Sequence, residues 1–395
     1  MTGSRLNIRL GCAEAGFGRL ARMFLMTLVA VALFALPSPP ARAADCKPEE
    51  TLRWRGGTLR VENDLVAGTD KNYTNGVSLT LISHDLEGKL RPRCLPLPVG
   101  LYARLLNEAD SKFSDKAGAE TAGQNLVVRI GQNMYTPEDM KRTDLIENDR
   151  PYAGLLYMGL GWNRRVHPED RSYEMLDQRE LTLGVIGPMS LAREAQNLVH
   201  DIRGFERFDG WDNQLGNEPA LLLTMERKYK PYVRGAVHRG WGADAVGGWA
   251  LRLGNIETSA SVSLELRAGR NIPNDFGSYS IRPGAENRPP SSLSRLAETR
   301  PDSSRAPRPG IHAFLNMEAK AVGWDFSLDG NLFRKSHSVD RKPLVAQAAA
   351  GFSSQWIVGG HGMRLAFMRV WRTREFGQQS ERAHSFGSVA FSMDF

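Results

Sequence analysis

The sequence predicts an all-β protein, a transmembrane antiparallel β-barrel of about twelve strands with a short helix in an extracellular-side loop. Three observations support this prediction. Apolar and polar residues alternate with period two along segments of about ten residues, the chain ends on an aromatic residue, Phe395, and it begins with an export signal. Such segments, separated by polar turns, are typical of outer-membrane barrels.

The N-terminal segment is predicted to be a secretory signal peptide covering residues 1–43. Arg19 and Arg22 precede an apolar run from Met23 to Leu36, and prolines and the small-residue site Ala41-Arg42-Ala43 follow. The run is too short for a transmembrane helix. Residues 44–395 are then one outer-membrane β-barrel domain, since no change in composition divides them.

The charge and the cysteines narrow the possible functions. The formal net charge is +7, and five arginines against one glutamate in the leader supply four of these charges. The mature chain is therefore too weakly basic to predict nucleic-acid binding. Cys46 and Cys94 remain as an even pair in an exported chain, which favours a disulfide over two free thiols.

The alternation is clearest in three segments. From Ser259, apolar Val262, Leu264 and Leu266 alternate with polar neighbours, and WDFSLDG near Trp324 and the final strand repeat the pattern. A soluble β-sandwich would alternate in the same way, but the C-terminal Phe395 resembles the recognition signal of outer-membrane proteins.

Fourteen segments have the composition of strands, and twelve is equally compatible, because a barrel of this kind needs an even number. The candidates are 57–63, 77–83, 125–133, 153–162, 180–187, 220–229, 232–241, 245–253, 259–268, 310–319, 322–328, 345–354, 363–371 and 384–395.

The predicted topology places three polar loops on one rim. If the mature N-terminus is periplasmic, connections after odd-numbered strands face the cell exterior. Residues 64–75, 135–152 and 188–218 follow the first, third and fifth strands. The segment 271–309, rich in Pro, Ser and Arg, is interpreted as a long solvated loop, with lipopolysaccharide phosphates as the alternative partners of its arginines.

Two of these outer loops contain candidate site residues. Gln196 and His200 lie four residues apart in a run with helical spacing, so both face one side of a short helix. Asn63 and Asp64 end a strand and offer oxygens that suit calcium. A helix-surface histidine and an Asx-type turn are the alternatives without chemistry. The chain lacks a Gly-x-Ser-x-Gly motif, which argues against an ordinary serine esterase.

Five motifs then carry a resemblance to a known family. In this order and spacing they resemble the outer-membrane lipid A 3'-O-deacylase family; they are VENDLVAGTDKNYTNG, GQNMYTPEDM, DRPYAGLLYMGLGW, LGVIGPMSLAREAQNLVHDIRG and GWDNQLGNEP. The likeness spans most of residues 61–227, with a weaker match at the C-terminus. It implies a twelve-stranded barrel in the bacterial outer membrane and a Ca²⁺-dependent esterase that removes the 3'-linked acyl group of lipid A in the outer leaflet.

The resemblance also implies site residues. The catalytic set falls on His200, Asn63, Thr74 and Lys141, with Arg142 as the substitute for Lys141. The metal ligand of the family's Asn-Asp pair falls on Asp64. Glu206, six residues after His200, is a further metal ligand or orienting residue, with a residue that merely caps the loop as the alternative.

The implied mechanism resembles that of a phospholipase A2. His200 activates water, Ca²⁺ stabilises the oxyanion, and the partners are lipid A and the outer membrane. We expect a monomer. The alternatives are an outer-membrane phospholipase with a serine nucleophile and a non-enzymatic barrel or pore that binds lipopolysaccharide.

Overall fold

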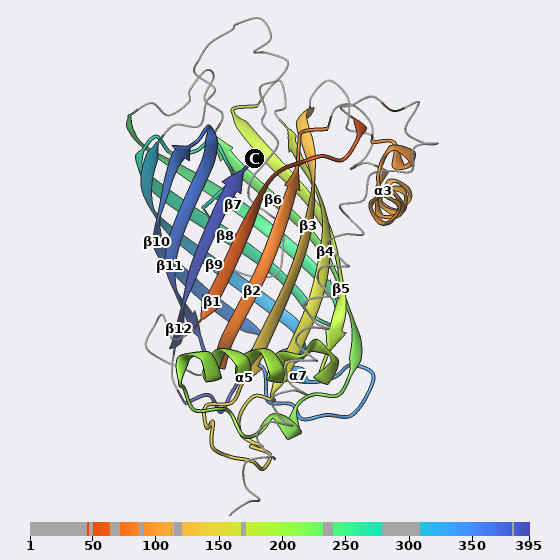
Figure 1. Cartoon of the computed structure of the whole chain (residues 1–395), viewed down its shortest axis with the longest axis vertical. Helices are drawn as coiled ribbons and strands as arrows, with labels where there is room; N and C mark the ends of the chain where they lie inside the picture. The colour runs from red at the N-terminus through yellow and green to blue at the C-terminus, as the bar shows by residue number, and fades with distance from the viewer. Residues whose placement is uncertain are drawn as a thin grey trace, which may run out of the picture.

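The computed structural model is a closed antiparallel barrel in which each strand pairs with its neighbours in sequence and β1 closes the ring against β12 (Figure 1). It describes residues 46, 50–63, 72–86, 90–111, 113, 121–166, 171–231, 240–278, 309–380 and 383–395. The predicted signal peptide lies outside these residues. Among the described residues, no helix has the length and apolar composition needed to cross a membrane.

The described residues form twelve strands. They are β1 (Trp54–Asn63), β2 (Asn72–Ser83), β3 (Thr121–Thr136), β4 (Ala153–Val166), β5 (Tyr173–Ile186), β6 (Glu218–Pro231), β7 (Trp241–Gly254), β8 (Glu257–Arg270), β9 (Gly310–Asp325), β10 (Leu344–Val358), β11 (His361–Thr373) and β12 (Ala383–Asp394). The short elements between them are η3 (Pro92–Cys94), α3 (Leu97–Ala109), η4 (Pro188–Ser190), α5 (Ala192–Arg203), η5 (Trp211–Asn213) and α7 (Phe326–Asp329).

Two of the fourteen strand predictions were wrong. Among the described residues no strand lies between β6 and β7, which are hydrogen-bonded directly to each other, and the predicted strand 232–241 contributes only its last residue to β7. Residues 232–239 lie outside the described part. The prediction 322–328 is the end of β9 followed by α7, because the Asp325 side chain accepts a hydrogen bond from the Ser327 amide and starts a helical turn.

The apolar residues of the alternating strands face outward, as a membrane protein requires. On β8, Val262 and Leu264 are exposed on the outer wall, whereas Ser261, Glu265 and Arg267 are buried inside. A soluble sandwich would bury the apolar set instead. The predicted membrane barrel is therefore confirmed against the sandwich alternative.

The interior of the barrel is filled by charged side chains in contact with one another. Arg129 pairs with Glu180 at 3.3 Å, and Lys320 pairs with Glu257 at 3.1 Å. Asp275, in the segment that follows β8, lies among Arg267 and Arg364. Buried charges of this kind are tolerated when each has a partner.

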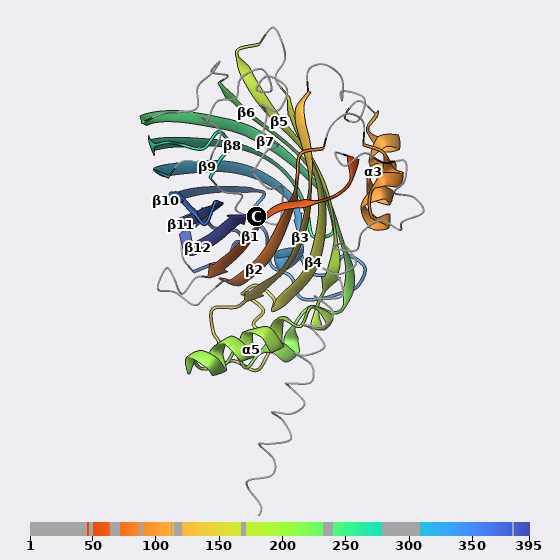
Figure 2. The ribbon, with the colours of Figure 1, turned by 45° about the horizontal axis from the view of Figure 1, so that its top comes forward.

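The two ends of the barrel differ. We call the end that carries α5 the outer rim, and the end that carries the start of β1 and the C-terminal Phe395 the inner rim. Figures 1 and 2 show α3 and α5 at these opposite ends. At the inner rim, Cys46 and Cys94 form the disulfide that the cysteine count favoured.

The segment 271–309 follows β8 and therefore leaves the barrel at the inner rim. The alternative interpretation of this segment, with its arginines on lipopolysaccharide phosphates, concerns residues outside the described part and stays a prediction. The extra predicted strand 232–241 had made this segment follow an odd-numbered strand, and had therefore placed it on the outer side of the membrane. Residues 279–308 lie outside the described part.

Candidate active site at the outer rim

Helix α5 presents one polar and buried face to the barrel. Ala192, Gln196 and His200 follow one another at four-residue intervals and are 0%, 2% and 3% exposed. The opposite side carries the exposed apolar residues Leu198 and Ile202. The predicted helix is confirmed, but His200 is a buried residue and not the helix-surface histidine of the alternative interpretation.

The start of α5 lies close against β4 because Gly154 has no side chain. A Cβ atom at this position would lie 2.1 Å from Ser190 Oγ and 2.4 Å from Ala192 Cβ. Gln132 of β3 donates a hydrogen bond to the Ser190 carbonyl at 2.6 Å. The helix is thus fixed to the rim at its first turn.

The first two turns of α5 pack on an aromatic cluster formed by the following loop and by the β3–β4 loop. Ala192 contacts a buried group of Met134, Tyr152, Phe208 and Trp211. Trp211 Nε1 donates a hydrogen bond of 2.6 Å to Gln196 Oε1. Burial raises the pKa of Tyr152 to about 12, so its hydroxyl stays protonated.

Gly204 ends α5 and turns the chain back toward His200. Its φ of 70° lies in the left-handed region, which glycine adopts without steric cost. The Phe205 amide then donates to the His200 carbonyl at 2.9 Å. Two residues after the turn, the Glu206 carbonyl oxygen accepts a hydrogen bond from His200 Nδ1.

This contact fixes the tautomer of neutral His200. A carbonyl oxygen can only accept, so Nδ1 carries the proton and Nε2 has the free lone pair. No hydrogen bond joins Nε2 to any of the residues that the structure describes. The rings of Phe205 and Phe208 lie edge-on to the imidazole at 5.9 and 5.7 Å and hold its plane.

Lys141 lies beside this turn. Its Nζ forms a 2.7 Å ion pair with Glu206 Oε2, and both side chains are exposed. Arg142, the substitute considered for Lys141, pairs instead with Asp144. The structure therefore brings Lys141, Glu206 and His200 together at the end of α5.

A second ion pair strengthens the turn. Arg207 holds Asp201 through two hydrogen bonds, which lower the pKa of the Asp201 carboxyl. Gly210 then passes close to the β3–β4 loop, where a Cβ would lie 2.8 Å from the Arg142 carbonyl oxygen.

The other predicted site residues lie at the end of the first hairpin. Asp64 is outside the described residues, and the side chains of Asn63 and Thr74 are too. The backbone of Asn63 ends β1 opposite Asn75 of β2 and Gly387 of β12. Thr74 lies in the bulge of β2 between Asn72 and Asn75. Both strand ends are on the outer rim with α5.

The described residues do not by themselves assemble a calcium site. The carboxylate of Glu206, one of the two predicted ligands, is paired with Lys141. Among the described residues, the one cluster of three potential ligands is Cys46, Glu50 and Cys94, at the inner rim, and its two sulfurs are joined as the disulfide.

Contacts between loops extend from this site across the outer rim. The β3–β4 loop contributes Glu138, which accepts a hydrogen bond from Ser380 of the β11–β12 loop. Arg150 and Glu375 join the same two loops through a buried 2.9 Å ion pair. The site and the end of the barrel near β12 thus form one connected assembly.

The sequence did not predict a role for Trp211, Phe208 and Tyr152 in the site. They carry no reactive group, and their role is to hold Gln196 and His200 in place. The motif GWDNQLGNEP, which includes Trp211, was the available signal, although it was used only for the resemblance.

A family model and one solved structure agree with this architecture. A family model described as outer membrane protein LpxR matches residues 25–395. No curated protein matched the sequence.

Among solved structures, LpxR from Salmonella typhimurium superposes with a TM-score of 0.59 at 18% identity, covering 86% of this chain and 100% of that one. The translocator domain of the autotransporter NalP from Neisseria meningitidis gives 0.38 at 9% identity, covering 97% of each chain. The β domain of the Bordetella autotransporter BrkA gives 0.35 at 8% identity, covering 87% of this chain and 97% of that one.

Proposed function

Because the chain belongs to the LpxR family of outer membrane proteins, we propose that it is a lipid A 3'-O-deacylase that works in the outer leaflet. Its location in the bacterial outer membrane follows from the family and from the barrel. The observation that carries the enzymatic proposal is the state of His200, a buried imidazole whose Nδ1 is fixed by the Glu206 carbonyl and whose Nε2 has no hydrogen-bond partner among the described residues.

In the proposed reaction, His200 Nε2 accepts a proton from a water molecule, which attacks the carbonyl carbon of the 3'-ester. The tetrahedral intermediate collapses with cleavage of the bond between that carbon and the sugar oxygen. The imidazolium returns its proton to the leaving alkoxide. Nδ1 keeps its hydrogen bond to the Glu206 carbonyl throughout.

Lys141 is the proposed positive group beside the reacting carbonyl or the glucosamine phosphate. Its exposure and its ion pair with Glu206 leave the ammonium group free to exchange partners when a substrate arrives. Thr74 and Asn63 are proposed as further hydrogen-bonding groups.

Calcium remains a proposal from the resemblance. Asp64 is its proposed ligand, and the bound ion would supply positive charge to the oxyanion. We retain Glu206 as a second proposed ligand, although its pairing with Lys141 favours a positioning role.

The location of the site suits a lipid substrate. Leu198, Ile202 and Phe205 are exposed apolar side chains around the buried His200. Acyl chains can therefore stay in apolar surroundings while the ester reaches the imidazole. We expect a monomer, with no contribution from nucleic acid.

Two alternatives make different predictions. A serine phospholipase needs a hydroxyl on Nε2, and no serine of the described residues makes that contact. A passive pore needs an open lumen, whereas buried charged side chains line this one, and Asp275, in the segment after β8, pairs with both Arg267 of β8 and Arg364 of β11.

The test is incubation of the detergent-folded protein with lipid A and, separately, with phospholipid. Fatty acid released from lipid A alone supports the deacylase. Release from phospholipid alone would favour the phospholipase, and no release together with stable conductance in planar bilayers would favour the pore.

A further inference from the structure

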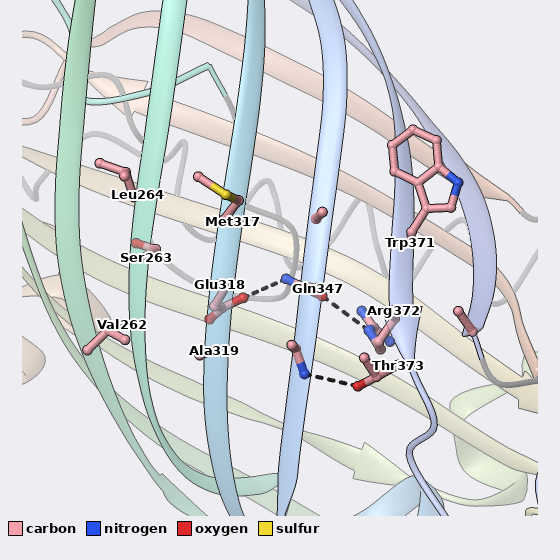
Figure 3. Close-up of a pocket in the computed structure, with 13 residues that line it drawn as sticks. Val262, Ser263, Leu264, Met317, Glu318, Ala319, Gln347, Trp371, Arg372 and Thr373 are labelled. Carbon is pink, nitrogen blue, oxygen red and sulfur yellow. Dashed lines mark hydrogen bonds between the residues drawn. The ribbon is translucent and has the colours of Figure 1, made fainter.

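A concave area of about 630 Å³ lies on the barrel wall formed by β8 to β12 (Figure 3). Small residues form its base, namely Ala319, Ala346, Ala348 and Ala383. Larger apolar side chains, Leu264 and Trp371 among them, border it. We call this area the alanine groove. Its volume is within the range of sites that hold small ligands.

The alanine groove opens to the membrane and not to the lumen. The residues that alternate with its alanines face inward, and Figure 3 shows them as a hydrogen-bonded row. In this row Gln347 donates to Glu318 at 2.5 Å, and Arg372 donates to Gln347 at 3.1 Å. By contrast, Val262 and Trp371 are 61% and 41% exposed. The empty space is therefore on the lipid-facing side.

The groove lies in the half of the wall near the outer rim. Thr373 is the last residue of β11 and Ala383 the first of β12, and both line the groove. Ala346 is two residues from the start of β10. The lipids that contact this half of the wall belong to the outer leaflet.

An exposed cation stands beside the groove on the same wall. Arg369 faces outward on β11, opposite Gly387 of β12. Its guanidinium donates a 3.0 Å hydrogen bond to Ser385, which is the register partner of Trp371, and lies 5.7 Å from the Trp371 ring centroid. The guanidinium thus lies level with Trp371, two residues nearer the outer rim than the Arg369 backbone. This is expected of an arginine whose side chain reaches toward the membrane surface.

A groove for a hydrocarbon chain and an arginine directed at the head-group layer together fit one chemical class, a phosphorylated lipid. Guanidinium binds phosphate through paired charged hydrogen bonds. The groove ends at β12, which is hydrogen-bonded to β1 and its Asn63. The β11–β12 loop above it contacts the β3–β4 loop of the site.

We propose that the alanine groove holds an acyl chain of a lipid A molecule whose phosphate pairs with Arg369. The identity of the lipid rests on the proposed function. The groove then acts as a binding site outside the reacting centre, which retains lipid A at the wall next to β1.

The test measures binding in a His200→Ala background, so that hydrolysis does not remove the ligand. Native mass spectrometry follows retention of three probes: bisphosphorylated lipid A, the same lipid A without phosphates, and phosphatidylethanolamine. Arg369→Gln removes the cation, and Ala348→Trp fills the groove. The matched controls are Arg270→Gln, an exposed arginine on β8 at the inner rim, and Ala313→Trp, an exposed alanine of β9 in the inner half of the wall.

We expect Arg369→Gln to bind bisphosphorylated lipid A about tenfold more weakly and to lose the preference over the dephosphorylated form. Ala348→Trp should weaken both forms, and the two controls should change neither. If Ala348→Trp does not fold, the comparison of Arg369→Gln with Arg270→Gln still tests the proposal. Unchanged retention in Arg369→Gln, or phosphatidylethanolamine bound as tightly as lipid A, would overturn the proposal. Wild-type protein that retains lipid A through the groove but never cleaves it would contradict the proposed function alone.

Discussion

His200 Nδ1 donates a hydrogen bond to the main-chain carbonyl oxygen of Glu206, six residues later in the chain. The contact requires the chain to reverse directly after α5. Because the acceptor is a main-chain atom, changing the Glu206 side chain should not remove it. The local backbone therefore decides how His200 is presented.

We expect Gly204→Ala to reduce deacylation of lipid A about tenfold or more, because the turn that places the Glu206 carbonyl needs a φ of 70°. The left-handed conformation itself should cost about 1 kcal/mol for alanine. Gly359→Ala is the matched control, since Gly359 has a φ of 59° in the β10–β11 turn and also has no neighbour within 4 Å of a built Cβ. Equal loss of initial rate in both variants would show a general folding effect.

Gly154→Val should displace the start of α5. The new side chain would overlap Ser190 and Ala192, so we expect loss of activity and protease sensitivity in the loop between β5 and β6. Gly247→Ala on β7 is the control, because its built Cβ has a single neighbour, at 4.0 Å. Limited proteolysis of the detergent-folded proteins measures the effect. A Gly154→Val protein with unchanged cleavage pattern and rate would contradict this account of how α5 is held.

Lys141→Gln separates catalysis from stability. Its ion pair with Glu206 is exposed, so the free energy of unfolding should change by less than about 1 kcal/mol. The initial rate should fall about a hundredfold if Lys141 stabilises developing charge. Arg193→Gln removes a comparably exposed pair with Asp212 and should leave the rate unchanged. A Lys141→Gln enzyme as fast as wild type would remove Lys141 from the mechanism.

Removal of calcium tests the proposed metal. Chelation should lower the deacylation rate about a hundredfold or more, and added Ca²⁺ should restore it. Asp64→Asn should show the same low rate and should not be restored. Isothermal titration of the two proteins with Ca²⁺ gives an independent measure. Full activity in chelator would show that Lys141 and His200 suffice without a metal.

Strands were predicted well where apolar and polar residues alternate without interruption, as in β8. The prediction failed where an alternating segment leaves the sheet. Phe326 and Leu328 continue the alternation that starts at Trp324 near the end of β9, but Asp325 caps a helical turn there. Contacts at the rim decide whether such a segment stays in the sheet or turns into a helix. The spacing of apolar residues does not reveal these contacts.

The candidate site shows the same limit. Helical spacing was enough to put Gln196 and His200 on one face, and they are both buried there. The acceptor for His200 could not be predicted, because it is a main-chain oxygen placed by Gly204 and not a side chain with a motif of its own. The pairing of Lys141 with Glu206 likewise depends on two loops meeting in space.

The most direct test of the central claim is mass spectrometry of lipid A after incubation with wild-type protein and with His200→Ala. We expect the wild type to remove the 3'-linked acyl group. His200→Ala should be slower by about 10²-fold or more while remaining a folded, heat-modifiable barrel. His337→Ala is the control, since His337 also bonds a main-chain oxygen at the outer rim, that of Asp149 at 2.8 Å, and it should keep full activity. Wild-type activity in the folded His200→Ala protein, with the same acyl group lost, would contradict the assignment of His200 as the base.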